Sequence, residues 1–175
     1  MKYTLLLLVF VANFAAFAQD KLNVFDVARN GTVADANLLL KNNRNAFNTS
    51  NSEGYAPLTL ACYRGNVEVA KIILENKCDV NANSNMGTPL MAAVVKGHLE
   101  IVKLLIDKKA DVNLSDNNRN TPLIYATMFK NIKIVKLLLK SNADPNYKDK
   151  NGKTALDIAI QANDDTLIQI IKTKY

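Results

Sequence analysis

The chain has 175 residues, of which 49% are hydrophobic and 22% are charged, and its formal net charge at pH 7 is +6. This length has room for one continuous domain, and no Ser- or Pro-rich linker divides it. A single histidine, with no partner base, acid or thiol beside it, excludes a catalytic triad or a histidine-based zinc site.

The first 18 residues have the pattern of a secretory signal peptide. Lys2 precedes an apolar run that Asn13 interrupts, and the run is shorter than the ~20 residues that span a bilayer. Ala16 and Ala18 provide the small residues that a signal peptidase reads. We therefore expect cleavage after Ala18 and a mature chain, 19–175, that is periplasmic or secreted and not stably inserted in a membrane. An uncleaved membrane anchor is the alternative.

A pattern with a nearly constant period fills the rest of the chain. Pro57, Pro89 and Pro122 stand 32 and 33 residues apart and each precedes a leucine, and the pair Ala155 and Leu156 continues the series. A fixed period of this size is typical of a solenoid, in which each unit buries its apolar face against its neighbours.

The unit at residues 87–119 shows the pattern most clearly. Thr88 and Pro89 start a short first helix, which Gly97 ends, with an inner face of Leu90, Ala93 and Val94. A second helix follows, with a broad apolar stripe made of Leu99, Ile101, Val102, Leu104, Leu105 and Ile106. We expect Leu104 to be a core residue. The stretch after Ala110 is rich in Asn, Asp and Ser, which favours a tight projecting turn whose side chains bond their own backbone.

These units resemble the ankyrin repeat, whose pattern runs G-x-TPLH-x-A-A-x-x-G-H, then a Leu-rich helix and G-A-D-V-N. The third unit, GTPLMAAVVKGHLEIVKLLIDKKADVN, is similar over its whole length. The resemblance implies an all-α solenoid of about five helix-turn-helix repeats with short, projecting, β-hairpin-like fingers, of an exported bacterial type. The predicted units are a degenerate N-terminal capping repeat, three central repeats and a C-terminal capping repeat, at 22–53, 54–86, 87–119, 120–151 and 152–175.

The sequence departs from the family pattern in two ways. Arg119 and Lys130 stand where the family usually has glycine, which predicts local strain in the fourth unit. The histidine of TPLH is replaced in four units, by Thr59, Met91, Ile124 and Asp157. We therefore expect apolar packing, in place of the usual polar network, to hold the middle units together, and we expect His98 to bind local backbone.

No motif predicts a metal, a cofactor or a reaction. Cys62 and Cys78 replace small buried residues, so we expect free, buried thiols, with a disulfide as the alternative. The oxygen-rich run from Asp111 to Asp116 begins like a calcium loop but lacks its glycine and glutamate, so finger turns account for it better. Nucleic-acid binding is not expected, because the basic residues of the fourth unit fall on the solvated outer face of its second helix, at Lys133, Lys136 and Lys140.

The resemblance implies that a protein partner binds at the finger tips and at the exposed end of each first helix. The pairs at those helix ends are Arg29–Asn30, Tyr63–Arg64, Val95–Lys96, Met128–Phe129 and Gln161–Ala162. We expect the middle three pairs to form a contiguous stripe on the concave face, with the composition of an interface core. The finger residues expected at its rim are Glu53, Tyr55, Asn85, Met86, Asn117, Asn118, Asn120, Lys150 and Lys153. The alternative is that Met128 and Phe129 tuck between repeats as core.

The sequence thus predicts a non-enzymatic, monomeric interaction module that works outside the cytoplasm and binds a protein of unknown identity. The principal sites are the stripe residues Tyr63, Arg64, Val95, Lys96, Met128 and Phe129 and the rim residues Tyr55, Met86, Asn118 and Asn120. The alternative function is an accessory, inhibitor or immunity-type protein that modulates a periplasmic or secreted enzyme. An enzyme would need a polar pocket with convergent acid or base groups, and the sequence offers none.

Overall fold

The computed structural model describes residues 22–84 and 87–173, so the predicted signal peptide and Met86 lie outside the described residues. Ten helices form five consecutive pairs within the described part. The first helices are α2 (Val24–Asn30), α4 (Pro57–Arg64), α6 (Pro89–Lys96), α8 (Pro122–Met128) and α10 (Ala155–Gln161). The second helices are α3 (Val33–Asn42), α5 (Val67–Glu75), α7 (Leu99–Asp107), α9 (Ile132–Lys140) and α11 (Asp165–Lys172).

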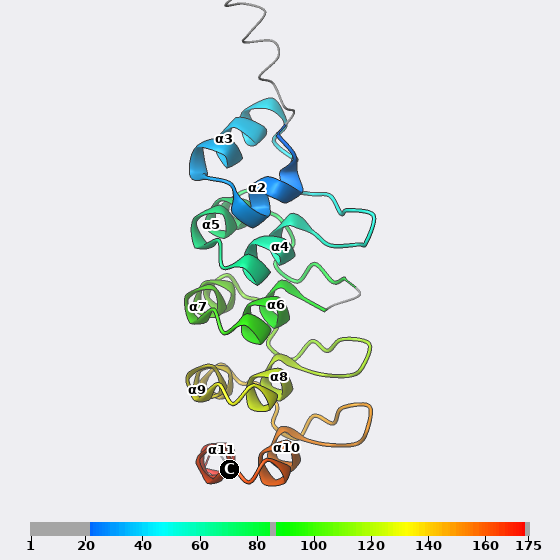
Figure 1. Cartoon of the computed structure of the whole chain (residues 1–175), viewed down its shortest axis with the longest axis vertical. Coiled ribbons are helices and arrows are strands. Elements are labelled where there is room, and N and C mark those ends of the chain that lie inside the picture. The colour runs from blue at the N-terminus through cyan, green and yellow to red at the C-terminus, as the bar shows by residue number, and fades with distance from the viewer. Residues whose placement is uncertain (1–21, 85–86, 174–175) are drawn as a thin grey trace, which may run out of the picture.

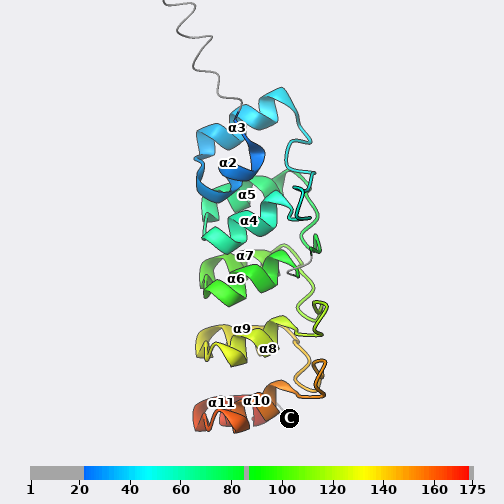
Figure 2. The same ribbon diagram turned by 45° about the vertical axis from the view of Figure 1, so that its right-hand side comes forward.

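The pairs stack along one axis into a solenoid. First helices form one column and second helices another, and the finger loops project from the side of the first-helix column (Figure 1). The columns stay aligned when the molecule is turned by 45° (Figure 2). The predicted all-α solenoid is confirmed. No helix of the described residues is long and apolar enough to cross a membrane.

The helix starts follow the sequence signals closely. Proline occupies the first turn of α4, α6 and α8, where its missing N–H costs no helical hydrogen bond. Thr88 and Thr121 cap α6 and α8, each accepting a hydrogen bond from a backbone N–H three residues on. Gly65 and Gly97 then end α4 and α6 in the left-handed conformation. The first helices are therefore short, and their ends stay open to solvent.

The core runs between the two helix columns. Within α7, Ile101, Val102 and Leu105 are fully buried, whereas Leu104 is only partly buried. The expectation that Leu104 is a core residue was therefore wrong. Leu105 lies inside the core and Leu104 packs at its margin, because the rotation of α7 in the stack sets which part of its broad apolar stripe is fully buried.

The finger loops are built on side chains that bond their own backbone. Asn51, Asp116 and Asp149 each accept hydrogen bonds at Oδ1 from the backbone N–H groups two and four residues further on. The shorter finger before Thr88 instead closes with an isolated antiparallel bridge between Ser84 and Gly87. The predicted finger turns are confirmed for these Asp and Asn side chains.

Polar contacts also join neighbouring repeats. The Asn81 amide oxygen accepts from the Asp111 N–H at 2.9 Å, and the Asn113 amide oxygen accepts from the Asp144 N–H at 2.7 Å. His98 Nε2 lies 3.3 Å from the carbonyl oxygen of Tyr63, in the preceding repeat. Apolar packing alone therefore does not hold the middle units together, and His98 binds a neighbouring repeat rather than local backbone. Both expectations were wrong because residues one period apart meet only after stacking.

The predicted backbone strain is present. Arg119 and Lys130 adopt φ values of 59° and 53°, in the left-handed region that disfavours side chains with a Cβ. Lys130 is the equivalent of Gly65 and Gly97, which adopt 81° and 74°. The other described non-glycine residues with positive φ are Lys77, Lys109, Asn142 and Asn163.

One buried polar atom lacks a partner within the described residues. Thr59 is 4% exposed, and its Oγ1 has no hydrogen-bond partner there. Thr127, also buried, donates from Oγ1 to the carbonyl oxygen of Leu123 at 2.9 Å. A buried hydroxyl without a partner costs about 1–3 kcal/mol of desolvation.

Replacing Leu105 with alanine should lower the free energy of unfolding by about 2–5 kcal/mol, because the side chain is fully buried between repeats. Urea unfolding followed by circular dichroism measures the change. Leu104→Ala is the matched control, and its cost should be clearly smaller. Equal costs for the two variants would contradict the assigned orientation of α7.

Replacing Lys130 with glycine should raise the free energy of unfolding by up to about 1 kcal/mol, because glycine adopts positive φ without a steric penalty. Lys130→Ala removes the same charge but keeps the penalty, so it should give no such gain in urea unfolding. A gain in both variants would assign the effect to the charge instead.

Thr59→Val should raise the free energy of unfolding by about 1 kcal/mol, because it replaces an unpartnered hydroxyl with a methyl group of the same shape. Thr127→Val should lower it by about the same amount, because it leaves the Leu123 carbonyl without this bond. Thermal melts of the two variants would refute the assignment if they shifted in the same direction.

Candidate functional site: the concave groove

A hollow of about 540 Å3 lies on the face made by the first helices and their fingers. We call it the groove. Its lining residues come from four successive repeats and are Arg29, Glu53, Tyr55, Thr59, Leu60, Tyr63, Arg64, Met91, Ala92, Val95, Asp116, Asn118, Tyr125 and Phe129. The repeat stacking therefore turns residues that are far apart in sequence into one continuous surface.

Most of the predicted site residues lie at this groove. Its lining includes Tyr55, Tyr63, Arg64, Val95, Asn118 and Phe129. Lys96 borders it, since its Nζ lies 4.4 Å from the centroid of the Tyr63 ring. Such a cation–π contact holds the ammonium group over the aromatic face at the groove edge.

Two predicted residues, Met128 and Asn120, lie elsewhere. Met128 is 50% exposed but does not line the groove. Asn120 is partly buried, and its backbone N–H donates to Asp116 Oδ1, so it shapes the finger without lining the groove. Met86 lies outside the described residues. Phe129 is 54% exposed, so the alternative that Met128 and Phe129 tuck between repeats was wrong.

The floor of the groove is formed by Leu60, Ala92 and Tyr125, which were not predicted as site residues from the sequence. Leu60, Ala92 and Tyr125 occupy the same position in three successive first helices, three residues before the first member of each exposed pair. Residues three and four apart share one helix face, so this column was recognisable from the spacing alone. Thr59 and Met91 are lining residues that precede this column.

Tyr125 connects the floor to the rim. Its ring stacks on Phe129 with centroids 6.5 Å apart, and its hydroxyl donates to Asp116 Oδ2 at 2.5 Å. Burial, and then the bond to Asp116, raise the pKa of Tyr125 above its ordinary value. The hydrogen bond to Asp116 and the stacking on Phe129 together fix the orientation of the ring.

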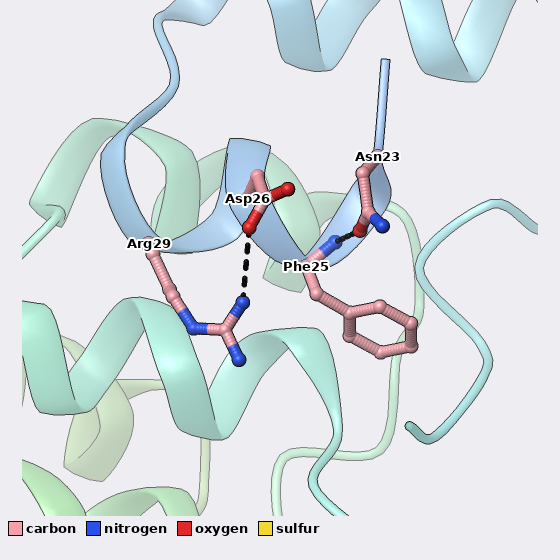
Figure 3. Close-up of polar contacts among 4 residues, drawn as sticks. All are labelled: Asn23, Phe25, Asp26 and Arg29. Atoms are coloured by element: carbon pink, nitrogen blue, oxygen red, sulfur yellow. Dashed lines mark hydrogen bonds and ion pairs between the residues drawn. The ribbon is translucent and has the colours of Figure 1, made fainter. Parts of the chain in front are cut away.

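The lining residue from the first repeat, Arg29, forms an ion pair within its own helix. Arg29 Nη1 lies 3.1 Å from Asp26 Oδ1, one turn earlier in α2 (Figure 3). Asn23 caps the same helix by accepting from the Phe25 N–H at 2.8 Å (Figure 3). These contacts hold Arg29 against its own helix.

The thiols are poor nucleophiles. Cys62 and Cys78 are free, and burial raises the pKa of both, far more strongly for Cys62. The structure confirms that Cys62 is buried, whereas Cys78 is only partly buried, contrary to expectation. The described residues contain no group of three or more His, Cys, Asp or Glu that could hold a metal ion.

Comparison with known proteins supports a single assignment. No curated protein sequence matches the chain. The family model for ankyrin repeats in three copies matches residues 24–116 and residues 110–174, which together cover nearly all of the described structure. The chain therefore belongs to the ankyrin repeat family.

Proposed function

We propose that this protein is a non-enzymatic interaction module that binds a protein partner in the groove, with the finger tips as its rim, outside the cytoplasm. Ankyrin repeats generally serve as protein–protein interaction modules. The observation that carries the proposal is the groove itself, a hollow of about 540 Å3 that spans four repeats and presents several aromatic side chains.

The composition of the groove favours protein binding. Tyr55, Tyr63, Tyr125 and Phe129 supply large, rigid side chains, and Arg64 supplies a planar cation. Tyrosine and arginine are the residue types that dominate binding energy at protein interfaces. An exposed phenylalanine lies next to them, and covering its apolar surface with a partner contributes favourably to the free energy of binding.

Export is supported by the sequence of residues 1–18, with its short apolar run and its small residues at the proposed cleavage site. The partner is then a protein of the periplasm or the extracellular space. A binder of this kind can stabilise, inhibit or tether its partner.

Replacing Tyr63 and Phe129 together with serine should abolish partner capture, because it removes two aromatic contacts from the groove, and neither residue is among the fully buried core residues. Chemical crosslinking in the envelope fraction of the producing cells, followed by mass spectrometry, identifies the captured protein. Binding is then measured with that protein in purified form.

Met128→Ser is the matched control, because Met128 is similarly exposed on α8 but does not line the groove. It should capture the same partner as the wild type. Circular dichroism must show that all variants are folded. Capture of the same proteins by the wild type and the folded Tyr63→Ser/Phe129→Ser variant would overturn the groove as the working site. A captured enzyme whose activity changes on binding would identify the module as an inhibitor or accessory protein.

A further inference from the structure

We propose that the segment bound in the groove is an extended peptide stretch that combines carboxylate side chains with bulky apolar ones. This inference rests on the proposed function and specifies the chemistry of the partner. Two observations support it: basic side chains at the groove have no ion-pair partner among the described residues, and apolar side chains line the groove next to them.

The C-terminal ends of three successive first helices carry basic residues without ion-pair partners. Arg64 and Lys96 lie in the last turns of α4 and α6, and Lys130 follows α8. We call these three residues the basic edge. The ion pairs within the described residues are Arg29–Asp26 and Lys71–Glu68, so no described carboxylate pairs with the basic edge.

The acidic groups near the groove are largely engaged already. Asp26 pairs with Arg29. Asp116 uses Oδ1 to accept two backbone N–H groups of its own finger, and Oδ2 to accept the Tyr125 hydroxyl. The remaining acid among the lining residues is Glu53, which is exposed on its finger. Its carboxylate has no hydrogen bond or ion pair within the described part of the chain. Arg64, which lines the groove, and Lys96, which borders it, are thus two open cations against one open anion, which favours carboxylates on the partner.

Two cations of the basic edge, Arg64 and Lys96, can recognise carboxylates in different ways. The Arg64 guanidinium is exposed and presents a planar fork of donors suited to bidentate bonding. The Lys96 ammonium is held over Tyr63, so it is positioned in advance beside an aromatic face. When a carboxylate of the bound peptide pairs with Lys96, an apolar side chain next to it in the peptide would therefore pack against Tyr63.

The floor requires apolar side chains on the partner. Leu60 and Val95 line the groove with partly exposed aliphatic side chains, together with the aromatic rings of Tyr63 and Tyr125. A purely acidic segment would leave this surface uncovered, and a purely apolar one would desolvate the basic edge without pairing it. A segment with both kinds of side chain satisfies both parts of the groove.

A peptide fits better than a single-stranded nucleic acid, which also combines negative charge with flat rings. The carboxylates of Glu53 and Asp116 both line the groove and would repel a continuous phosphate backbone. A peptide can place its carboxylates only opposite the basic edge.

The test is a selection of random 12-residue peptides displayed on phage against the purified full-length protein. Peptides that also bind the Tyr63→Ser/Phe129→Ser variant are discarded, so that the survivors depend on the groove. We expect the survivors to be enriched in Asp and Glu next to Phe, Tyr, Leu or Ile. The strongest is synthesised with a fluorescent label, and its dissociation constant is measured by anisotropy.

Charge reversal then tests the basic edge directly. Arg64→Glu/Lys96→Glu should weaken binding of the selected peptide by about tenfold or more, and raising the salt concentration should weaken binding to the wild type. The matched control is Lys103→Glu/Lys133→Glu, which makes the same charge change at exposed positions of the second helices α7 and α9. It should leave the dissociation constant within about twofold. A peptide whose carboxylates are changed to lysine should prefer the reversed variant.

The outcomes separate this inference from the proposed function. Groove-dependent peptides that are neutral or basic would overturn the acidic partner and leave the groove as a protein-binding site. An equal loss of affinity in the two charge-reversal variants would overturn the role of the basic edge alone. Failure of any peptide to enrich in a groove-dependent way would overturn both. Binding of a 12-nucleotide oligothymidylate with the same dependence on Arg64 and Lys96 would overturn the peptide in favour of nucleic acid.

Discussion

The close approach of neighbouring first helices is the constraint on which the rest of the structure depends. Alanine occupies the same position in four successive first helices, and each of these residues is fully buried: Ala61, Ala93, Ala126 and Ala159. A larger side chain at these fully buried positions would push the helices apart, because protein interiors are close-packed. The approach stacks the exposed helix ends in register, and without that register the groove residues would not form one surface.

The fingers stay in register through hydrogen bonds that are repeated once per unit. Asp and Asn side chains first bond their own loop, and Asn81 and Asn113 then accept from the backbone of the next finger. The bonding within each loop requires a left-handed residue at its tip, which is Gly54 in one finger and Arg119 in another. Arg119 tolerates this geometry while its guanidinium lies 5.5 Å from the centroid of the Tyr147 ring in the next finger. The rim of the groove is thus held from repeat to repeat.

The groove is the part of the molecule where the repeat pattern is least uniform. The positions that line it change from leucine to alanine to tyrosine, and from tyrosine to valine, while the buried positions beneath them stay small or aliphatic. Burial constrains the core positions because every repeat faces the same neighbour geometry. The groove positions face solvent, so packing leaves them free to carry aromatic rings and unpaired cations.

The sequence by itself determined the period, the helix pairs, the capping prolines and threonines and the finger turns, because each of these is a local signal repeated at one spacing. It also indicated the exposed helix ends, including Tyr63 and Phe129. The tertiary structure alone decided which of Leu104 and Leu105 is fully buried, that Cys78 is only partly buried, and that His98 reaches the preceding repeat. It also brought Asp116 to Tyr125 and excluded Met128 from the groove. These outcomes depend on the rotation of each helix and on contacts across repeats, which a periodic pattern leaves open until the units are stacked.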